Sequence, residues 1–284
     1  MPQRFDNFFH EVTGNEAERC HYPTRLDTYG CGCQHNRGYC YARSLLAFRG
    51  LWNPQFPSAA AYRDIFKVVK NKLRPGQVVR LGGMTDCFQP MEAARKNTLR
   101  TLDLLNRRRV HYLIVTKGAL IAQPQYLEAM DQSLAHIQVS ITSTNAEISR
   151  RVEPGASLPE DRIRAVETLA AADFDTSVRL SPFIPSFVDL ARINAIQCDK
   201  ILVEFLRVNT WIERWLRDLG VSTAEYTQFH GGYKHLPLAR KRELLDGITG
   251  FPQVSVCEDV PEHWEYWRTR KNANPDDCCN LTFK

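Results

Sequence analysis

The sequence predicts an α/β protein folded as a partial (β/α)6 barrel of the TIM type. Short stretches rich in β-branched residues alternate with amphipathic stretches, and this alternation favours parallel strands joined by helical crossovers. The expected strands are residues 24–30, 78–83, 111–118, 137–143, 176–185 and 201–208. The expected helices are residues 91–107, 123–135 and 158–172.

Three parts are expected along the chain. Residues 1–23 form an N-terminal extension, and residues 24–208 form the partial barrel. Residues 209–284 form an aromatic, cysteine-containing C-terminal segment that closes the barrel or binds substrate. In such barrels the functional groups gather at the carboxyl ends of the strands.

Composition favours a soluble globular protein. Of the 284 residues, 43% are hydrophobic and 24% are charged, and no run of about 18 apolar residues suggests a membrane span. The first twenty residues lack the apolar core of a secretory signal, so we expect a cytoplasmic protein. The formal charge of +5 is compatible with a nucleic-acid partner but is weak support for one.

Nine cysteines in uneven spacing argue against a disulfide framework and favour metal binding. Cys31, Cys33 and Cys40 fall within ten residues on a glycine-containing stretch. Three thiolates can hold three irons of a [4Fe–4S] cluster and leave the fourth iron open for a ligand. The alternative is a zinc site in which His35 supplies the fourth ligand.

Polar side chains follow several expected strands. Thr85 and Asp86 follow the second strand, Lys117 ends the third, and Ser140 and Thr142 lie late in the fourth. Cysteine, acid, lysine and hydroxyl groups at strand ends together indicate a site.

The segment from Cys33 to Arg43, which ends in Tyr39-Cys40-Tyr41-Ala42-Arg43, resembles the cluster loop of the radical S-adenosylmethionine (SAM) superfamily, usually C-x3-C-x-aromatic-C. It resembles most the branch related to spore photoproduct lyase. Further matches in order are residues 83–92 (GMTDCFQPME), 116–117, 139–142, 151–154 and 182–185. Together they cover roughly residues 24–208.

This resemblance implies a [4Fe–4S] cluster and SAM as cofactors, and a reductant such as flavodoxin or ferredoxin as a partner. It implies reductive cleavage of SAM to a 5′-deoxyadenosyl radical that abstracts a substrate hydrogen, in lyase or isomerase chemistry. The branch points to a DNA base or a modified nucleobase as substrate, in repair, rearrangement or hypermodification. The alternatives are a radical SAM enzyme acting on a peptide or small metabolite, and a non-enzymatic zinc-binding protein on a degenerate barrel.

One position departs from the family pattern. The middle cysteine would fall at position 37, which is arginine. Either Cys31 supplies the third ligand in a rewired C-x-C-x6-C motif, or the cluster is lost. We expect rewiring, with Cys31, Cys33 and Cys40 as metal ligands, and Arg37 at the SAM pocket or the substrate mouth.

The resemblance also assigns contacts with SAM. Tyr39 is expected against the adenine, Lys117 at the carboxylate and Ser140 at a further polar contact. The methionine amino group is expected to meet Gly82, Gly83, Met84 and Thr85. Asp86 is expected to accept a hydrogen bond from that amine or from the ribose.

Cys87 is expected to face the same cavity and to donate a hydrogen atom to a substrate radical. Spore photoproduct lyase has its donor cysteine on the N-terminal side of the matching segment. Here Met84 lies on that side and Cys87 follows Asp86, which argues against repair of thymine dimers.

The remaining cysteines leave several interpretations open. A second cluster bound by Cys257, Cys278 and Cys279 is one interpretation. The others are that these three cysteines close a substrate pocket or have no special role. No role is assigned to Cys20 and Cys198. Residues 264–271 mix aromatic and basic side chains, which suits stacking on bases and pairing with phosphates. The alternative is an amphipathic helix with its tryptophans in the core.

Overall fold

The computed structural model describes residues 5–281 and contains an eight-stranded sheet in the order β1-β2-β5-β6-β7-β8-β9-β12. β1 pairs antiparallel with β2, and every other neighbouring pair is parallel. The bounds are β1 Phe9–Glu11, β2 Thr24–Leu26, β5 Val78–Leu81, β6 His111–Thr116, β7 Ala135–Ile141, β8 Asp175–Phe183, β9 Lys200–Phe205 and β12 Gln253–Cys257. The expected fold class, an α/β partial barrel, is confirmed.

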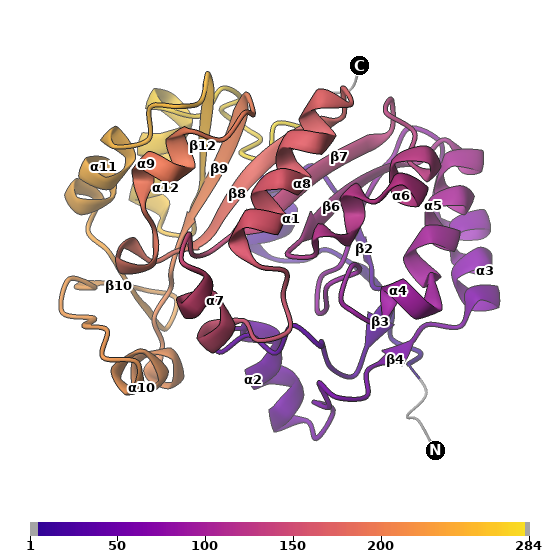
Figure 1. Cartoon of the computed structure of the whole chain (residues 1–284), viewed down its shortest axis with the longest axis horizontal. Coiled ribbons are helices and arrows are strands. Elements are labelled where there is room, and N and C mark those ends of the chain that lie inside the picture. Colours follow the sequence, from indigo (N-terminus) through magenta and orange to yellow (C-terminus); the bar gives the residue numbers. More distant parts are fainter. Residues whose placement is uncertain (1–4, 282–284) are drawn as a thin grey trace.

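Helices such as α5 and α8 pack on the outer face of the sheet, and α2 and α10 lie below the ends of the strands (Figure 1). The helices are α1 Asn15–Arg19, α2 Tyr41–Phe48, α3 Tyr62–Lys72, α4 Glu92–Arg95, α5 Asn97–Arg108, α6 Pro124–Ala129, α7 Ala146–Val152, α8 Pro159–Ala171, α9 Leu190–Asn194, α10 Thr210–Asp218, α11 Leu238–Asp246 and α12 Pro261–Arg270. Short 3-10 turns lie at Ala119–Ala122 and Pro185–Phe187, and two small hairpins pair β3 Tyr29–Gly30 with β4 Ser58–Ala59 and β10 Gln228–His230 with β11 Tyr233–His235.

The sheet extends beyond the strands that the sequence predicts. β12 follows the expected barrel boundary at residue 208 and adds a parallel strand beside β9. β1 comes from the expected N-terminal extension and pairs with β2. The expected first strand, residues 24–30, is divided into two strands. Residues 24–26 form β2, and residues 29–30 form β3, which pairs with β4.

Side chains of the strands divide between two different environments. Val79, Ile114 and Leu180 point outward into the main apolar core under the helices. Arg80 and Arg179 alternate with them in the same strands and line a cavity inside the barrel. Because successive residues of a strand face opposite sides, a fully apolar outer layer leaves the inner positions free to be polar.

The expected helix over residues 91–107 is divided into α4 and α5. Lys96 has a left-handed backbone with φ of 51°, which ends α4 and begins α5. The buried Glu92 carboxylate accepts hydrogen bonds from the backbone N–H groups of Thr98 (2.9 Å) and Leu99 (3.0 Å). Glu92 thus satisfies the free donors at the start of α5 from inside the core.

Within residues 5–281 no helix has both the length and the apolar character needed to cross a membrane.

The first prediction concerns Glu92. The Glu92→Ala variant leaves the first turn of α5 and the hydroxyl of Tyr126, which donates to Glu92 (2.8 Å), without a buried acceptor. We expect a loss of about 3 kcal/mol in the free energy of unfolding, measured by denaturant titration. The control Glu128→Ala, an exposed change on α6, is expected to shift it by no more than about 0.5 kcal/mol. Equal stability of the two variants would contradict the capping role.

Candidate functional site at the carboxyl ends of the strands

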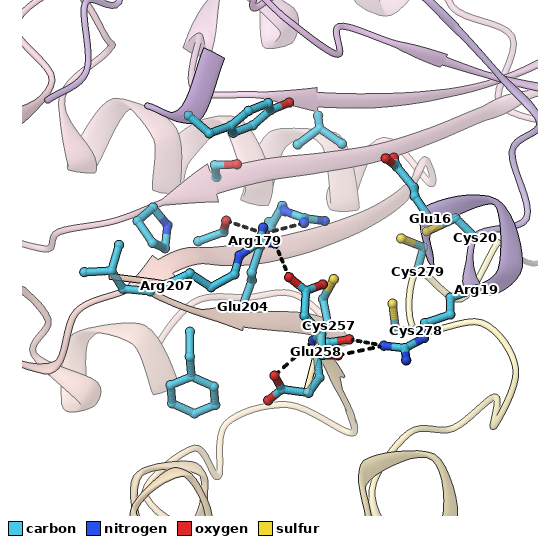
Figure 2. Close-up of a pocket in the computed structure, with 18 of the residues that line it drawn as sticks. Glu16, Arg19, Cys20, Arg179, Glu204, Arg207, Cys257, Glu258, Cys278 and Cys279 are labelled. Carbon is cyan, nitrogen blue, oxygen red and sulfur yellow. Dashed lines mark hydrogen bonds and ion pairs between the residues drawn. The ribbon is translucent and has the colours of Figure 1, made fainter. Parts of the chain in front are cut away.

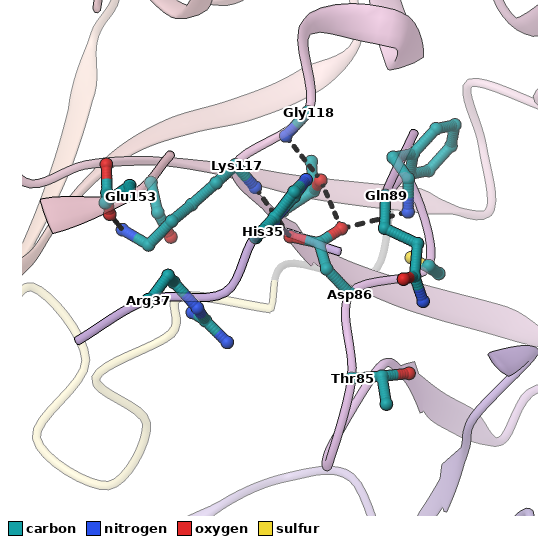
Figure 3. Close-up of polar contacts among 12 residues, drawn as sticks. His35, Arg37, Thr85, Asp86, Gln89, Lys117, Gly118 and Glu153 are labelled. Atoms are coloured by element: carbon teal, nitrogen blue, oxygen red, sulfur yellow. Dashed lines mark hydrogen bonds and ion pairs between the residues drawn. The ribbon is translucent and has the colours of Figure 1, made fainter. Parts of the chain in front are cut away.

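The cysteine loop is attached to the barrel by hydrogen bonds that begin at Gln34 and His35. The backbone N–H of Gln34 donates to Gln89 (2.8 Å), and the Gln34 side chain accepts from the N–H of Met91 (2.6 Å). The His35 ring nitrogen Nδ1 lies 3.2 Å from the Asp86 carboxylate (Figure 3). These contacts fix the loop across the end of β5.

The Asp86 carboxylate is hydrogen-bonded to other groups of the protein. Its carboxylate accepts from the Thr116 hydroxyl (2.7 Å) and from the backbone N–H groups of Lys117 (2.8 Å) and Phe88 (2.9 Å). Burial alone would raise the pKa of Asp86, but His35 and these donors hold it well below its usual range. Asp86 is not among the residues that line the cavity, so its expected contact with SAM stays a prediction.

The turn after β5 is organised by a second buried acid. One oxygen of Asp27 accepts from the backbone N–H groups of Gly83 (2.9 Å), Met84 (3.1 Å) and Thr85 (3.1 Å). Gly82 has φ of +79°, a conformation that favours glycine. None of these four turn residues lines the cavity, and their expected contact with the SAM amino group also stays a prediction.

Two of the three expected ligand thiols lie together. Arg37 donates from Nη2 to the Cys40 sulfur (3.5 Å), and its charge also acts on the Cys33 thiol. Burial raises the pKa of Cys33 to about 12. Cys31 is held elsewhere, by a hydrogen bond with Ser58 and a left-handed backbone with φ of 55°. Among the described residues no three His, Cys, Asp or Glu side chains surround a single metal position.

Lys117 belongs to a buried network of charges. Its Nζ donates to the Thr142 hydroxyl (2.6 Å) and lies 3.1 Å from the Glu153 carboxylate. Arg162, also fully buried, pairs with the other Glu153 oxygen (2.5 Å), and the Tyr39 hydroxyl donates to Glu153. Burial lowers the pKa of Lys117 to about 7, while burial of Glu153 is outweighed by the two cations, which lower its pKa.

A cavity of about 600 Å³ connects this region with the interior of the barrel. At its upper end, by the carboxyl ends of the strands, it is lined by Tyr39, Cys40, Lys117, Ser140 and Arg37. Of the SAM contacts that the sequence predicts, the structure therefore brings Tyr39, Lys117 and Ser140 to the cavity.

Elsewhere in the cavity, arginines are paired with acids (Figure 2). Arg179 on β8 lies 2.6 Å from Glu204 on β9, and Arg207 pairs with Glu204 (3.0 Å) and with Asp259. Sequence reasoning did not identify these residues. The signal was present, since Arg179 interrupts an apolar strand at an inward-facing position.

Cys87 lies outside the cavity. It is fully buried in the main apolar core, beside Phe88 and Leu102, and does not line the cavity. The structure therefore does not place Cys87 in the cavity, where the sequence led us to expect it. The role of Cys87 as hydrogen donor stays a prediction.

Residues 264–271 fall in and just after α12. Trp267 is buried in the core, as the alternative interpretation expects. Trp264 instead lines the cavity, with the Arg19 guanidinium 5.4 Å from its ring centre.

Helix α10 lies over the cysteine loop. The Trp215 ring meets Tyr39 edge-on at 5.8 Å, and a side chain at Gly38 would collide with the Trp215 indole. The Arg43 guanidinium lies 5.7 Å from the ring of Trp211. The C-terminal segment therefore covers the loop from outside.

Comparison with known families gives one match. Residues 28–192 match the sequence model of the Radical SAM superfamily. Two similar proteins are the uncharacterized protein Rv2578c of Mycobacterium tuberculosis and the uncharacterized protein MJ0683 of Methanocaldococcus jannaschii. The first is 28% identical over 202 residues, 66% of this chain and 59% of that protein. The second is 28% identical over 168 residues, 57% of this chain and 61% of that protein. The chain thus spans about three-fifths of the length of these relatives.

Solved structures with a similar fold include spore photoproduct lyase complexed with dinucleoside spore photoproduct. Its TM-score is 0.59 at 14% identity, covering 87% of this chain and 74% of that chain. A mutant of spore photoproduct lyase has a TM-score of 0.63 at 14% identity, covering 89% and 80%. At this identity the likeness concerns the fold.

The second prediction tests the charge network. Glu153→Gln removes the negative charge that Lys117 and Arg162 share, and leaves two buried cations without compensation. We expect a loss of about 3–5 kcal/mol in the free energy of unfolding. The matched control Glu160→Gln breaks an exposed pair with Arg192 and should change it by no more than about 1 kcal/mol. A small effect at position 153 would mean that the network is not needed to hold Lys117.

Proposed function

Since the chain belongs to the radical SAM superfamily, we propose that it is an enzyme that abstracts a hydrogen atom from a DNA base or a modified nucleobase. The observation that carries this proposal is the composition of the cavity. Besides Tyr39 and Lys117, which the proposal assigns to SAM, the cavity is lined by Trp264 and Arg19. Aromatic rings that stack on a base and cations that meet phosphates are the groups such a substrate requires.

Membership of the family implies a [4Fe–4S] cluster and SAM as cofactors, together with a reductant. When bound, the cluster supplies the electron that splits SAM and so starts radical chemistry on the substrate. Cys33 and Cys40 suit two of the three ligand positions, because both thiols are buried beside each other at the loop. We propose that Cys31 supplies the third ligand, for which it must leave Ser58. Flavodoxin or ferredoxin is the proposed reductant.

The residues of the chain have separate tasks in this proposal. Lys117 holds the SAM carboxylate by a charge-assisted hydrogen bond. Tyr39 and Ser140 bound the same end of the cavity, and Glu153 positions both Tyr39 and Lys117. Trp215 on α10 limits the access of water to Tyr39 from outside.

The third prediction concerns the loop. Arg37→Cys restores the family spacing, with cysteines at positions 33, 37 and 40. After anaerobic reconstitution with iron, sulfide and dithionite, we expect wild-type protein and Arg37→Cys to convert SAM into 5′-deoxyadenosine. Cys33→Ala and Cys40→Ala should form none, while the buried control Cys198→Ala should behave as wild type.

The Cys31→Ala variant separates the two interpretations of the loop. If Cys31 is the third ligand, Cys31→Ala is inactive and the Arg37→Cys change restores cleavage in the double variant. Full activity of Cys31→Ala would remove Cys31 from the ligand set. Failure of wild-type protein to hold iron or cleave SAM, with zinc bound instead, would overturn the proposed function.

The fourth prediction follows from the lowered pKa of Lys117. A lysine whose pKa is about 7 loses its charge as the pH rises through 7, so fewer molecules can bind a carboxylate. We expect SAM to bind reconstituted protein roughly tenfold or more weakly at pH 8.5 than at pH 6, measured by calorimetry. Lys117→Arg keeps its charge over this range and should show no such dependence. Equal affinity of wild-type protein at both pH values would contradict the assigned contact.

A further inference from the structure

Four cysteines outside the loop line the cavity and lie near one another (Figure 2). Cys20 follows α1, Cys257 ends β12, and Cys278 and Cys279 lie in the turn after α12. The Cys278 thiol donates hydrogen bonds to the sulfurs of Cys257 and Cys279. Cys20 lies within electrostatic range of Cys279 and Cys257. All four are free thiols.

The segments that carry these thiols are held in place independently of them. Arg19 donates to the backbone oxygen of Glu258 (2.9 Å), which joins α1 to the end of β12. The buried Asp277 carboxylate accepts from the N–H groups of Cys279 (2.9 Å) and Leu281 (2.8 Å). The Asn280 amide donates to Ser255 (2.6 Å). Three distant parts of the chain are thus fixed around one group of sulfurs.

The surroundings supply positive charge. Arg179 acts electrostatically on Cys279 and Cys257, and Arg80 acts on Cys20 and Cys279. Both arginines lie on inward-facing positions of the barrel. Four sulfurs that become thiolates carry a large negative charge, and buried guanidinium groups beside them reduce the free-energy cost of that charge.

We propose that Cys20, Cys257, Cys278 and Cys279 bind a second iron–sulfur cluster, of the [4Fe–4S] type. Four cysteine sulfurs are a complete ligand set for such a cluster. They are also a ligand set for zinc, but structural zinc sites are closed by their ligands. Here the sulfurs line a cavity of about 600 Å³, which leaves room beside them for a bulky cluster. In this structure no three of these sulfurs surround a single metal position, and the Cys278 thiol is hydrogen-bonded to two of the others, so side-chain rotation must move the sulfurs apart as the cluster binds.

This second cluster is not part of the proposed function. Its ligands line the same cavity as Cys40, so both clusters would face the space in which a substrate binds. Because its four ligands are separate from Cys31, Cys33 and Cys40, it does not depend on how the loop binds iron.

The fifth prediction is tested on full-length protein in which the loop is disabled. Cys33→Ala/Cys40→Ala, reconstituted anaerobically with iron and sulfide, should still hold about four irons and four sulfides per chain. It should show the low-temperature electron paramagnetic resonance signal of a reduced [4Fe–4S] cluster. The same protein carrying also Cys257→Ser and Cys278→Ser should hold none, while adding Cys198→Ser, a buried thiol elsewhere, should change nothing.

Alkylation is a second measurement, and it does not depend on the folding of variants with more than two substitutions. In Cys33→Ala/Cys40→Ala, iodoacetamide labelling of the four cysteines, followed by mass spectrometry, should slow at least tenfold after iron loading. The proposal is overturned if the loop variant holds no iron, if it co-purifies with zinc that iron and sulfide do not replace, or if anaerobically purified protein contains a disulfide among these cysteines. If the loop variant retains the four irons but reconstituted wild-type protein does not cleave SAM, only the proposed function is rejected.

Discussion

The buried carboxylate of Asp86 is the contact on which the site depends. It lies at the end of β5 and accepts from Thr116 and Lys117 at the end of β6, while His35 reaches it from the cysteine loop. Two strand ends and one loop are therefore fixed by a single group. Because these partners stabilise the ionised form in the absence of water, the carboxylate keeps the loop in place without facing the cavity.

The barrel interior follows the opposite rule from its outer face. Outside, apolar side chains pack under helices such as α5 and α8. Inside, Arg179, Glu204 and Arg207 form pairs in which each charge has a partner. These pairs contribute little to stability for their size, since desolvation offsets the attraction within them. A second apolar cluster on the same inner face includes Val78, Leu113 and Leu202, so the inner wall mixes charged and apolar side chains.

Much of this arrangement could be predicted from the sequence, and the failures have physical reasons. The alternation of strand and helix patterns identified the parallel sheet, and Lys117 and Ser140 were placed at the cavity because strand ends share one edge. Asp86 and Thr85 were expected there for the same reason, but their partners His35, Asp27 and Tyr29 are distant in sequence, and only folding shows that they are already engaged. Cys87 was expected in the cavity as the neighbour of Asp86, but both residues lie outside the cavity, and Cys87 packs in the main apolar core. No sequence pattern around Cys20 indicated a role for it, since the thiols near it in the fold come from the other end of the chain.

The contact of Cys20 with Cys257, Cys278 and Cys279 can form only late in synthesis of the chain. Arg19 and its acceptor Glu258 are 239 residues apart in the chain. At a synthesis rate of 5–20 residues per second, the first of these thiols waits on the order of 10 to 50 s for its neighbours. The strands β2 to β9 can pair during that interval, whereas the inner wall of the barrel stays open to solvent beside Cys20. The sulfur-lined part of the cavity can therefore be completed only after residues 278–281 have been synthesised.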